Sequence, residues 1–166
     1  MAIIPKKAVG TRQIVLLYTL VRIYARCRYW DAKDAVEARL LRPYFVAAPG
    51  RGALDAVTEQ ALLCELAVSK GEGAVAGMID LEKYYESIQP SEVLRGLLWL
   101  GLPRFFAILL LRVHLAPRRI TLRSAVSRPL HPTQSVIAGC TWATVICRVV
   151  ALPHIDRYVA YRTQVI

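Results

Sequence analysis

Apolar side chains recur every three to four residues in two stretches of the first half of the chain. This spacing predicts a helix from about residue 12 to residue 29, and an amphipathic helix over residues 54–69. The apolar face of the second helix is formed by Leu54, Val57, Ala61, Leu62 and Leu66. We interpret this face as core, because apolar stripes at helical spacing are buried more often than they bind a partner.

Proline and glycine residues divide the second half into further helices. Pro90 opens a helix that Gly101 ends, and Pro103 starts the next one. The apolar run Phe105–Leu111 is closed by arginines and is far shorter than the roughly 18 residues of a membrane span. We therefore expect a buried helix there, and a last helix over residues 142–152.

Three stretches favour strands instead of helices. Residues 1–7 are compatible with a short strand, and residues 74–81 form an apolar run between turn signals. Residues 118–123 alternate, with Ile120 and Leu122 on one face. Helices and strands in this order predict an α+β or α/β fold and not a helix bundle.

The net positive charge lies almost entirely in the second part of the chain. Residues 1–92 hold 12 Lys and Arg against 11 Asp and Glu, whereas residues 93–166 hold 10 Arg, no Lys and a single acid, Asp156. A one-signed segment of this kind favours a polyanionic partner, nucleic acid first. An anionic membrane surface, or an arginine-rich composition without a partner, is the alternative.

The four cysteines, at positions 27, 64, 140 and 147, lack the spacing of a zinc site or a redox pair. We expect reduced thiols in an intracellular protein. His131 and His154 also lack ligand spacing with Cys140 and Cys147, and no His is paired by motif with Cys140. The sequence therefore predicts neither a zinc centre nor a catalytic thiol.

Asp80 stands at the end of the strand predicted over residues 74–81. A carboxylate at a strand end faces the edge of a sheet, where it can bind Mg²⁺, an ion that prefers oxygen ligands. Two such ions serve a polymerase by activating the attacking 3′-oxygen and steadying the leaving pyrophosphate. An isolated Asp is more often an ordinary surface residue, so its neighbours decide between the two interpretations.

The segment Asp80-Leu-Glu-Lys-Tyr-Tyr-Glu-Ser-Ile88 resembles the first catalytic motif of reverse transcriptases of the non-LTR retrotransposon and group II intron type. That motif has an Asp, four residues and an aromatic gate. The resemblance implies that Asp80 is a catalytic ligand for Mg²⁺. It also implies that Tyr85 is the gate that tests the sugar of the incoming nucleotide.

Two segments of the first half follow the order of the same family. Ile4-Pro5-Lys6-Lys7, with Arg12 shortly after, looks like the fingers motif. This implies that Lys6, Lys7 and Arg12 contact the incoming triphosphate or the template. Pro49-Gly50-Arg51-Gly52 looks like the segment before the palm, which implies nucleic-acid binding by Arg51.

A segment of the second half, residues 135–144 with Gly139-Cys140 at its centre, is similar to a loop and helix of the family that pack against the template and the new base pair. The similarity implies a nucleotide-binding role for Gly139. The segment departs from the family pattern, because Ala138 stands where Gln is expected and Thr141-Trp142 replaces Pro-Leu. In the fingers motif, Gln13 replaces the usual Pro.

The second catalytic motif of the family, an aromatic residue followed by paired Asp, is not found, since Asp156 has no Asp neighbour. A two-ion site with one committed carboxylate is incomplete, so we expect no polymerase activity from this chain alone. The resemblance implies a fragment of an RNA-directed DNA polymerase, whose complete family performs two-metal nucleotidyl transfer. The implied partners are an RNA template or RNA/DNA hybrid and a dNTP, without a membrane span.

The fold that the resemblance implies is a partial fingers and palm, an α+β fold with a small antiparallel sheet packed by helices. We expect one partial domain over residues 1–166, fingers-like over 1–70 and partial palm over 71–166. We also expect poor solubility, because without the missing palm hairpin the strand over residues 74–81 would keep an open edge.

Two alternatives stay open. The chain can be a non-catalytic nucleic-acid-binding remnant that uses the arginine-rich residues 93–166. Arg118, Arg119 and Arg123 lie on or beside a predicted strand, where they either hold a nucleic-acid backbone or form a solvated face. The less favoured alternative is a membrane-surface or partner-binding helical protein that uses Phe105–Leu111.

Overall fold

The structure is a computed structural model of the chain, and it describes residues 2–5, 11–14, 17–42, 50–74, 82–122 and 125–163. Of residues 2–5, 11–14, 122 and 160–163, it describes the backbone only. The chain forms two compact units, a larger one of residues 1–36 and 83–166 and a smaller one of residues 37–82. The expected division into fingers and palm at residue 70 stays a prediction.

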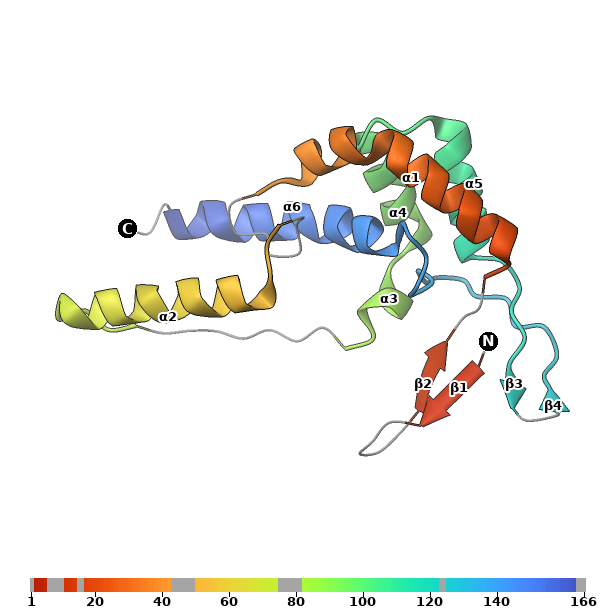
Figure 1. Ribbon diagram of the computed structural model, residues 1–166, viewed down its shortest axis with the longest axis horizontal. Helices are drawn as coiled ribbons and strands as arrows, with labels where there is room; N and C mark the ends of the chain where they lie inside the picture. The colour runs from red at the N-terminus through yellow and green to blue at the C-terminus, as the bar shows by residue number, and fades with distance from the viewer. Residues whose placement is uncertain are drawn as a thin grey trace. The chain divides into compact units, whose positions relative to one another are not determined.

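Helices hold most of the described residues (Figure 1). They are α1 (Thr19–Leu40), α2 (Ala53–Ser69), α3 (Tyr84–Ser87), α4 (Pro90–Trp99), α5 (Arg104–His114) and α6 (Ala143–Thr163). The predicted helices over residues 54–69, from Pro90 and from Pro103 are confirmed. α1 begins and ends later than predicted. α6 continues beyond residue 152, because Pro153 removes one backbone hydrogen bond without ending the helix.

The strands are short and pair with one another. β1 (Ala2–Pro5) pairs antiparallel with β2 (Thr11–Ile14), and β3 (Thr121–Leu122) pairs antiparallel with β4 (Ala125–Val126). One parallel pair, Ala2 with Thr121, joins β1 to β3 and gives the order β2-β1-β3-β4. Residues 75–81 of the predicted central strand lie outside the described residues.

The expected α+β fold, with an antiparallel palm sheet packed by helices, is wrong, because the described part of the chain is mainly helical. No strand in that part is longer than four residues. The closest packing between helices joins α4 to both α5 and α6. The helices are long enough to form the core and the strands are not. α4 and α5 have ten or more residues each and pack against each other, whereas the alternation over residues 118–123 yields a strand of two residues.

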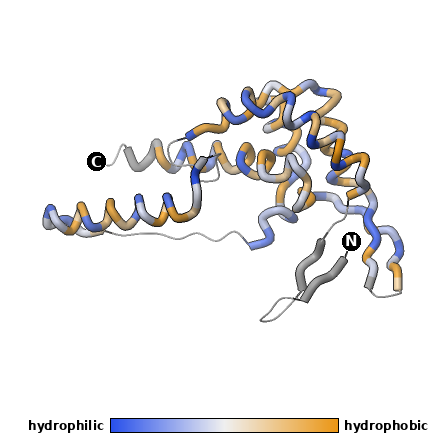
Figure 2. The backbone as a smooth tube through the Cα atoms, in the orientation of Figure 1, coloured by the Kyte–Doolittle hydropathy of each residue, from blue (hydrophilic) through white to orange (hydrophobic). Residues whose placement is uncertain are grey.

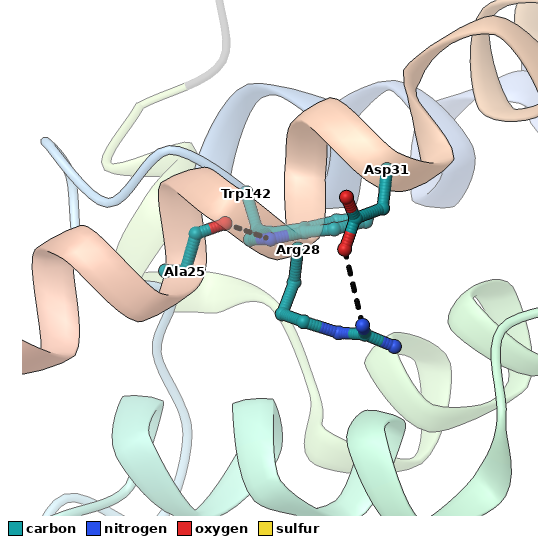
Figure 3. A network of polar contacts seen from close by, with 4 residues as sticks. All are labelled: Ala25, Arg28, Asp31 and Trp142. Atoms are coloured by element: carbon teal, nitrogen blue, oxygen red, sulfur yellow. Dashed lines mark hydrogen bonds and ion pairs between the residues drawn. The ribbon is translucent and has the colours of Figure 1, made fainter.

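Trp142 lies at the centre of the core of the larger unit. It is fully buried, and its indole N–H donates a hydrogen bond to the carbonyl oxygen of Ala25 in α1 (Figure 3). Its ring meets the rings of Tyr29 and Phe106 edge-on, with centroids 5.6 and 5.2 Å away. One side chain at the start of α6 therefore joins α1 to α5.

α5 bears out the buried helix expected over Phe105–Leu111. Phe106, Ala107 and Leu110 are buried, while Phe105 points to solvent.

α4 comes close to α6 at Gly96, because a Cβ at Gly96 would lie 2.6 Å from Cγ1 of Val149. Small side chains at such a position let two helix backbones come near each other.

α2, in the smaller unit, exposes the apolar face that we interpreted as core. The helix has no buried residue, although apolar positions recur along it (Figure 2). Leu54 is 76% exposed and Leu66 is 50% exposed, so the interpretation as core is wrong. A single amphipathic helix cannot cover its own face, and a second packed layer is needed to do so.

Candidate nucleic-acid interface

The segment that follows Asp80 and the segment around Gly139 lie against each other in the larger unit. The backbone N–H of Val136 donates a 2.7 Å hydrogen bond to the carbonyl oxygen of Tyr85. The hydroxyl of Tyr84 donates a 2.9 Å hydrogen bond to the carbonyl oxygen of Cys147. α3 is therefore fixed to the first turns of α6 and to the loop before it.

The two tyrosines of α3 are part-buried at this junction. Burial, and then the neighbouring Cys147, raises the pKa of Tyr84 to about 12 and also raises the pKa of Tyr85. Burial raises the pKa of Cys147 to about 11. All three groups therefore stay protonated near neutral pH, and the tyrosines act as neutral hydrogen-bond donors.

Gly139 forms a turn that only glycine adopts easily. Its φ is +94°, and a Cβ built on it meets no atom within 4 Å. The turn geometry, and not a close neighbour, therefore calls for glycine. Gly139 and Thr141 line one wall of a cavity of about 260 Å³, and Arg22 and Arg26 of α1 line the other.

Arg118 links the end of α5 to the loop before Gly139. Its guanidinium donates hydrogen bonds to the carbonyl oxygen of His114 and, at 3.4 Å, to the hydroxyl of Ser135. The backbone N–H of Ile137 donates to Nδ1 of His114 at 2.9 Å. Carbonyl groups at a helix C-terminus lack partners within the helix, so the hydrogen bond from Arg118 to the carbonyl oxygen of His114 stabilises the end of α5. Arg118 is thus largely engaged inside the protein.

Arg118 and Arg119 also line an open groove of about 470 Å³. Its other wall is the entry to α1, where Tyr18 is 86% exposed. Leu17 lines both this groove and the cavity at Gly139, so the two hollows adjoin. The combined surface offers cationic groups beside an exposed aromatic ring, which is the chemistry of nucleic-acid binding.

The other predicted site residues are not placed at this surface. Asp80, Lys6, Lys7 and Arg123 lie outside the described residues, and only the backbone of Arg12 is described, within β2. Arg51 is exposed and belongs to the smaller unit. Among the arginines of residues 93–166, Arg148 is only 5% exposed, so it adds little to a surface that meets a polyanion.

The expected magnesium site stays a prediction. Within the described ranges, no three His, Cys, Asp or Glu residues come together as they would around a metal ion. Asp80, the expected ligand, is not among these residues.

Tyr18, Arg22 and Arg26 fall within the helix predicted over residues 12–29, but none of them was among the predicted site residues. Their spacing of four residues is visible in the sequence. What the sequence did not reveal is that Arg22 and Arg26 face the loop at Gly139, more than 100 residues later in the chain.

Comparisons with known proteins identify no family. No protein-family model matches the chain, and no curated protein matches it either. Within the described part of the chain, no helix is both long and apolar enough to cross a membrane.

Proposed function

We propose that the chain is a nucleic-acid-binding segment of a reverse-transcriptase-like polymerase. The contact between Tyr85 and Val136 carries the proposal. The motif with Asp80 and Tyr85 and the motif with Gly139 resemble parts of one family, and a polymerase needs both beside the same base pair. In the larger unit these two segments share a 2.7 Å backbone hydrogen bond.

An arginine of the second half supports the binding part of the proposal. Arg119 is exposed and lines the same groove as Tyr18. Arginine forms forked hydrogen bonds with phosphate and keeps its charge at every physiological pH. The proposal assigns binding to the cationic and aromatic side chains that line the groove, and it assigns the chemical step of nucleotidyl transfer to none of the described residues.

A second candidate function is a non-catalytic nucleic-acid-binding remnant. It is favoured by the exposed Arg119 and the groove that it lines, since a phosphate backbone bound there would need no contribution from Asp80. The two candidates differ in whether the turn at Gly139 touches the paired end of a primer.

Photo-crosslinking separates the two candidates. An RNA template with 4-thiouridine at the first unpaired position, annealed to a DNA primer, is irradiated with the chain, and the linked peptides are identified by mass spectrometry. The polymerase segment predicts links to the peptides that hold Tyr85 and Gly139, and Gly139→Ala should weaken them because its φ is +94°. Gly73→Ala, at an open position of the smaller unit, is the matched control.

Links confined to the peptide with Arg118 and Arg119 would favour the remnant. The absence of any link, with no retention of the hybrid by the chain, would contradict both candidates.

A further inference from the structure

Tyr18, Arg22 and Arg26 form one row at the start of α1. They are spaced by four residues, which places them on one helix face in steps of about 6 Å along the axis. Tyr18 belongs to this row because its carbonyl oxygen accepts the first hydrogen bond of the helix, from the N–H of Arg22 at 3.1 Å. All three side chains are exposed.

The charge of this row is not neutralised within the described residues. The first turn of α1 has no acidic side chain. Arg28 pairs with Asp31 at 3.1 Å (Figure 3). Its guanidinium also lies over the ring of Phe106. Arg22 and Arg26, in contrast, have neither an ion pair nor a hydrogen bond from their side chains in the part of the chain that is described.

The surroundings of the row are concave. Arg22 and Arg26 line the 260 Å³ cavity whose opposite wall is the loop from Gly139 to Thr141. Tyr18 lines the 470 Å³ groove that also holds Arg119, and Leu17 lines both hollows. A strand that followed the row would thus meet four cationic or aromatic side chains in succession.

We propose that the row of Tyr18, Arg22 and Arg26 binds single-stranded nucleic acid, with backbone phosphates at the two arginines and an unpaired base stacked on Tyr18. This inference rests on the proposed function and adds which form of nucleic acid the chain takes and where. The steps of the row suit successive phosphates of an extended strand, and single-strand binders combine such cations with exposed rings. Bases inside a duplex have no free face to offer Tyr18.

The test measures binding of a fluorescein-labelled 20-nucleotide RNA by fluorescence anisotropy over a series of NaCl concentrations. The double variant R22Q/R26Q should lower the slope of log affinity against log salt by about 1.4, because each single-strand phosphate contact contributes about 0.7. Tyr18→Ala should weaken binding about tenfold and leave the slope unchanged, since stacking releases no counterions. Tyr18→Phe should bind like the native chain.

Matched controls lie in the same unit. R104Q/R112Q removes two exposed charges from α5, and Tyr158→Ala removes a ring of α6 that is 61% exposed. Neither control should change the affinity by more than about twofold, because exposed charges away from a binding surface act only through screened long-range fields. Near-ultraviolet circular dichroism of the buried Trp142 verifies that each variant is folded.

Several results would overturn the inference. One is a slope of log affinity against log salt that R22Q/R26Q leaves unchanged, or that R104Q/R112Q lowers by the same amount. Another is tighter binding of a blunt RNA duplex than of the single strand. A third is binding to phosphatidylserine vesicles that R22Q/R26Q abolishes while RNA binding persists. If only these variants fail, the proposed function stands, whereas a native chain that binds no nucleic acid contradicts the proposed function as well.

Discussion

The indole N–H of Trp142 donates a 2.9 Å hydrogen bond to the backbone carbonyl of Ala25, which lies 117 residues earlier in the chain. Trp142 follows the turn at Gly139 by three residues, and Ala25 lies between Arg22 and Arg26. This bond therefore sets the distance between the two walls of the cavity that we assign to nucleic acid. The stability of the core and the shape of the interface depend on the same side chain.

Trp142→Phe should lower the free energy of unfolding by about 2 kcal/mol, because it removes this hydrogen bond and leaves space around a smaller ring. Urea unfolding, followed by circular dichroism, measures the effect. Trp30→Phe is the control, since Trp30 is 59% exposed and the change should stay within about 0.5 kcal/mol. Equal midpoints for Trp142→Phe and the native chain would show that Trp142 is not packed as described.

Gly96→Ala should destabilise the larger unit, although alanine is normally the better helix former. The new Cβ would lie 2.6 Å from Cγ1 of Val149, and overpacking of this kind costs about 1–3 kcal/mol. Val149→Ala removes the methyl group that the new Cβ would meet, so Gly96→Ala should cost less in the Val149→Ala background. A double-mutant cycle by urea unfolding should therefore give a favourable coupling energy between the two substitutions. A stabilised Gly96→Ala variant would contradict the close approach of α4 and α6.

His114 should make the stability depend on pH. Burial, and then the charge of Arg118, lowers the pKa of His114 to about 4, against about 6.5 in an unfolded chain. Above pH 6.5 both states are neutral and the group contributes no pH dependence. Between pH 6.5 and 4 only the unfolded state takes up the proton, so the free energy of unfolding falls by up to about 1.4 kcal/mol per pH unit.

His114→Gln should remove that part of the pH dependence. Urea midpoints from pH 4 to 7 measure it, and His154→Gln, at an exposed position of α6, should keep the native profile. The same slope in His114→Gln as in the native chain would mean that His114 is protonated when folded. It would then not accept the hydrogen bond from Ile137 at Nδ1 as the structure shows.

Local signals in the sequence account well for the helices of the second half. Pro90, Gly101 and Pro103 predicted the limits of α4 and the start of α5 within a few residues, because capping and breaking act over one turn. The last helix was predicted to end at residue 152, but α6 continues through Pro153 to Thr163, since neighbouring turns can hold a helix through one missing hydrogen bond.

Contacts between distant segments could not be predicted in this way. The sequence shows that Arg118 is basic, but not that its guanidinium is engaged by the carbonyl of His114 and by Ser135. The apolar face of α2 has the pattern of a core helix, yet pattern alone does not say whether a second layer is present to cover it. The row of Tyr18, Arg22 and Arg26 can be recognised only when the start of α1 and the cavity beside it are known.

The most direct test of the account is the affinity of the native chain for an RNA/DNA hybrid with a single-stranded RNA overhang, measured from about 50 to about 300 mM NaCl. Several phosphate contacts would lower this affinity roughly a thousandfold or more over such a range. We predict a linear fall of log affinity with log salt, and tighter binding of this hybrid than of a blunt hybrid of the same length. No binding, or binding that salt does not weaken, would contradict the proposal that this chain binds nucleic acid through its arginines.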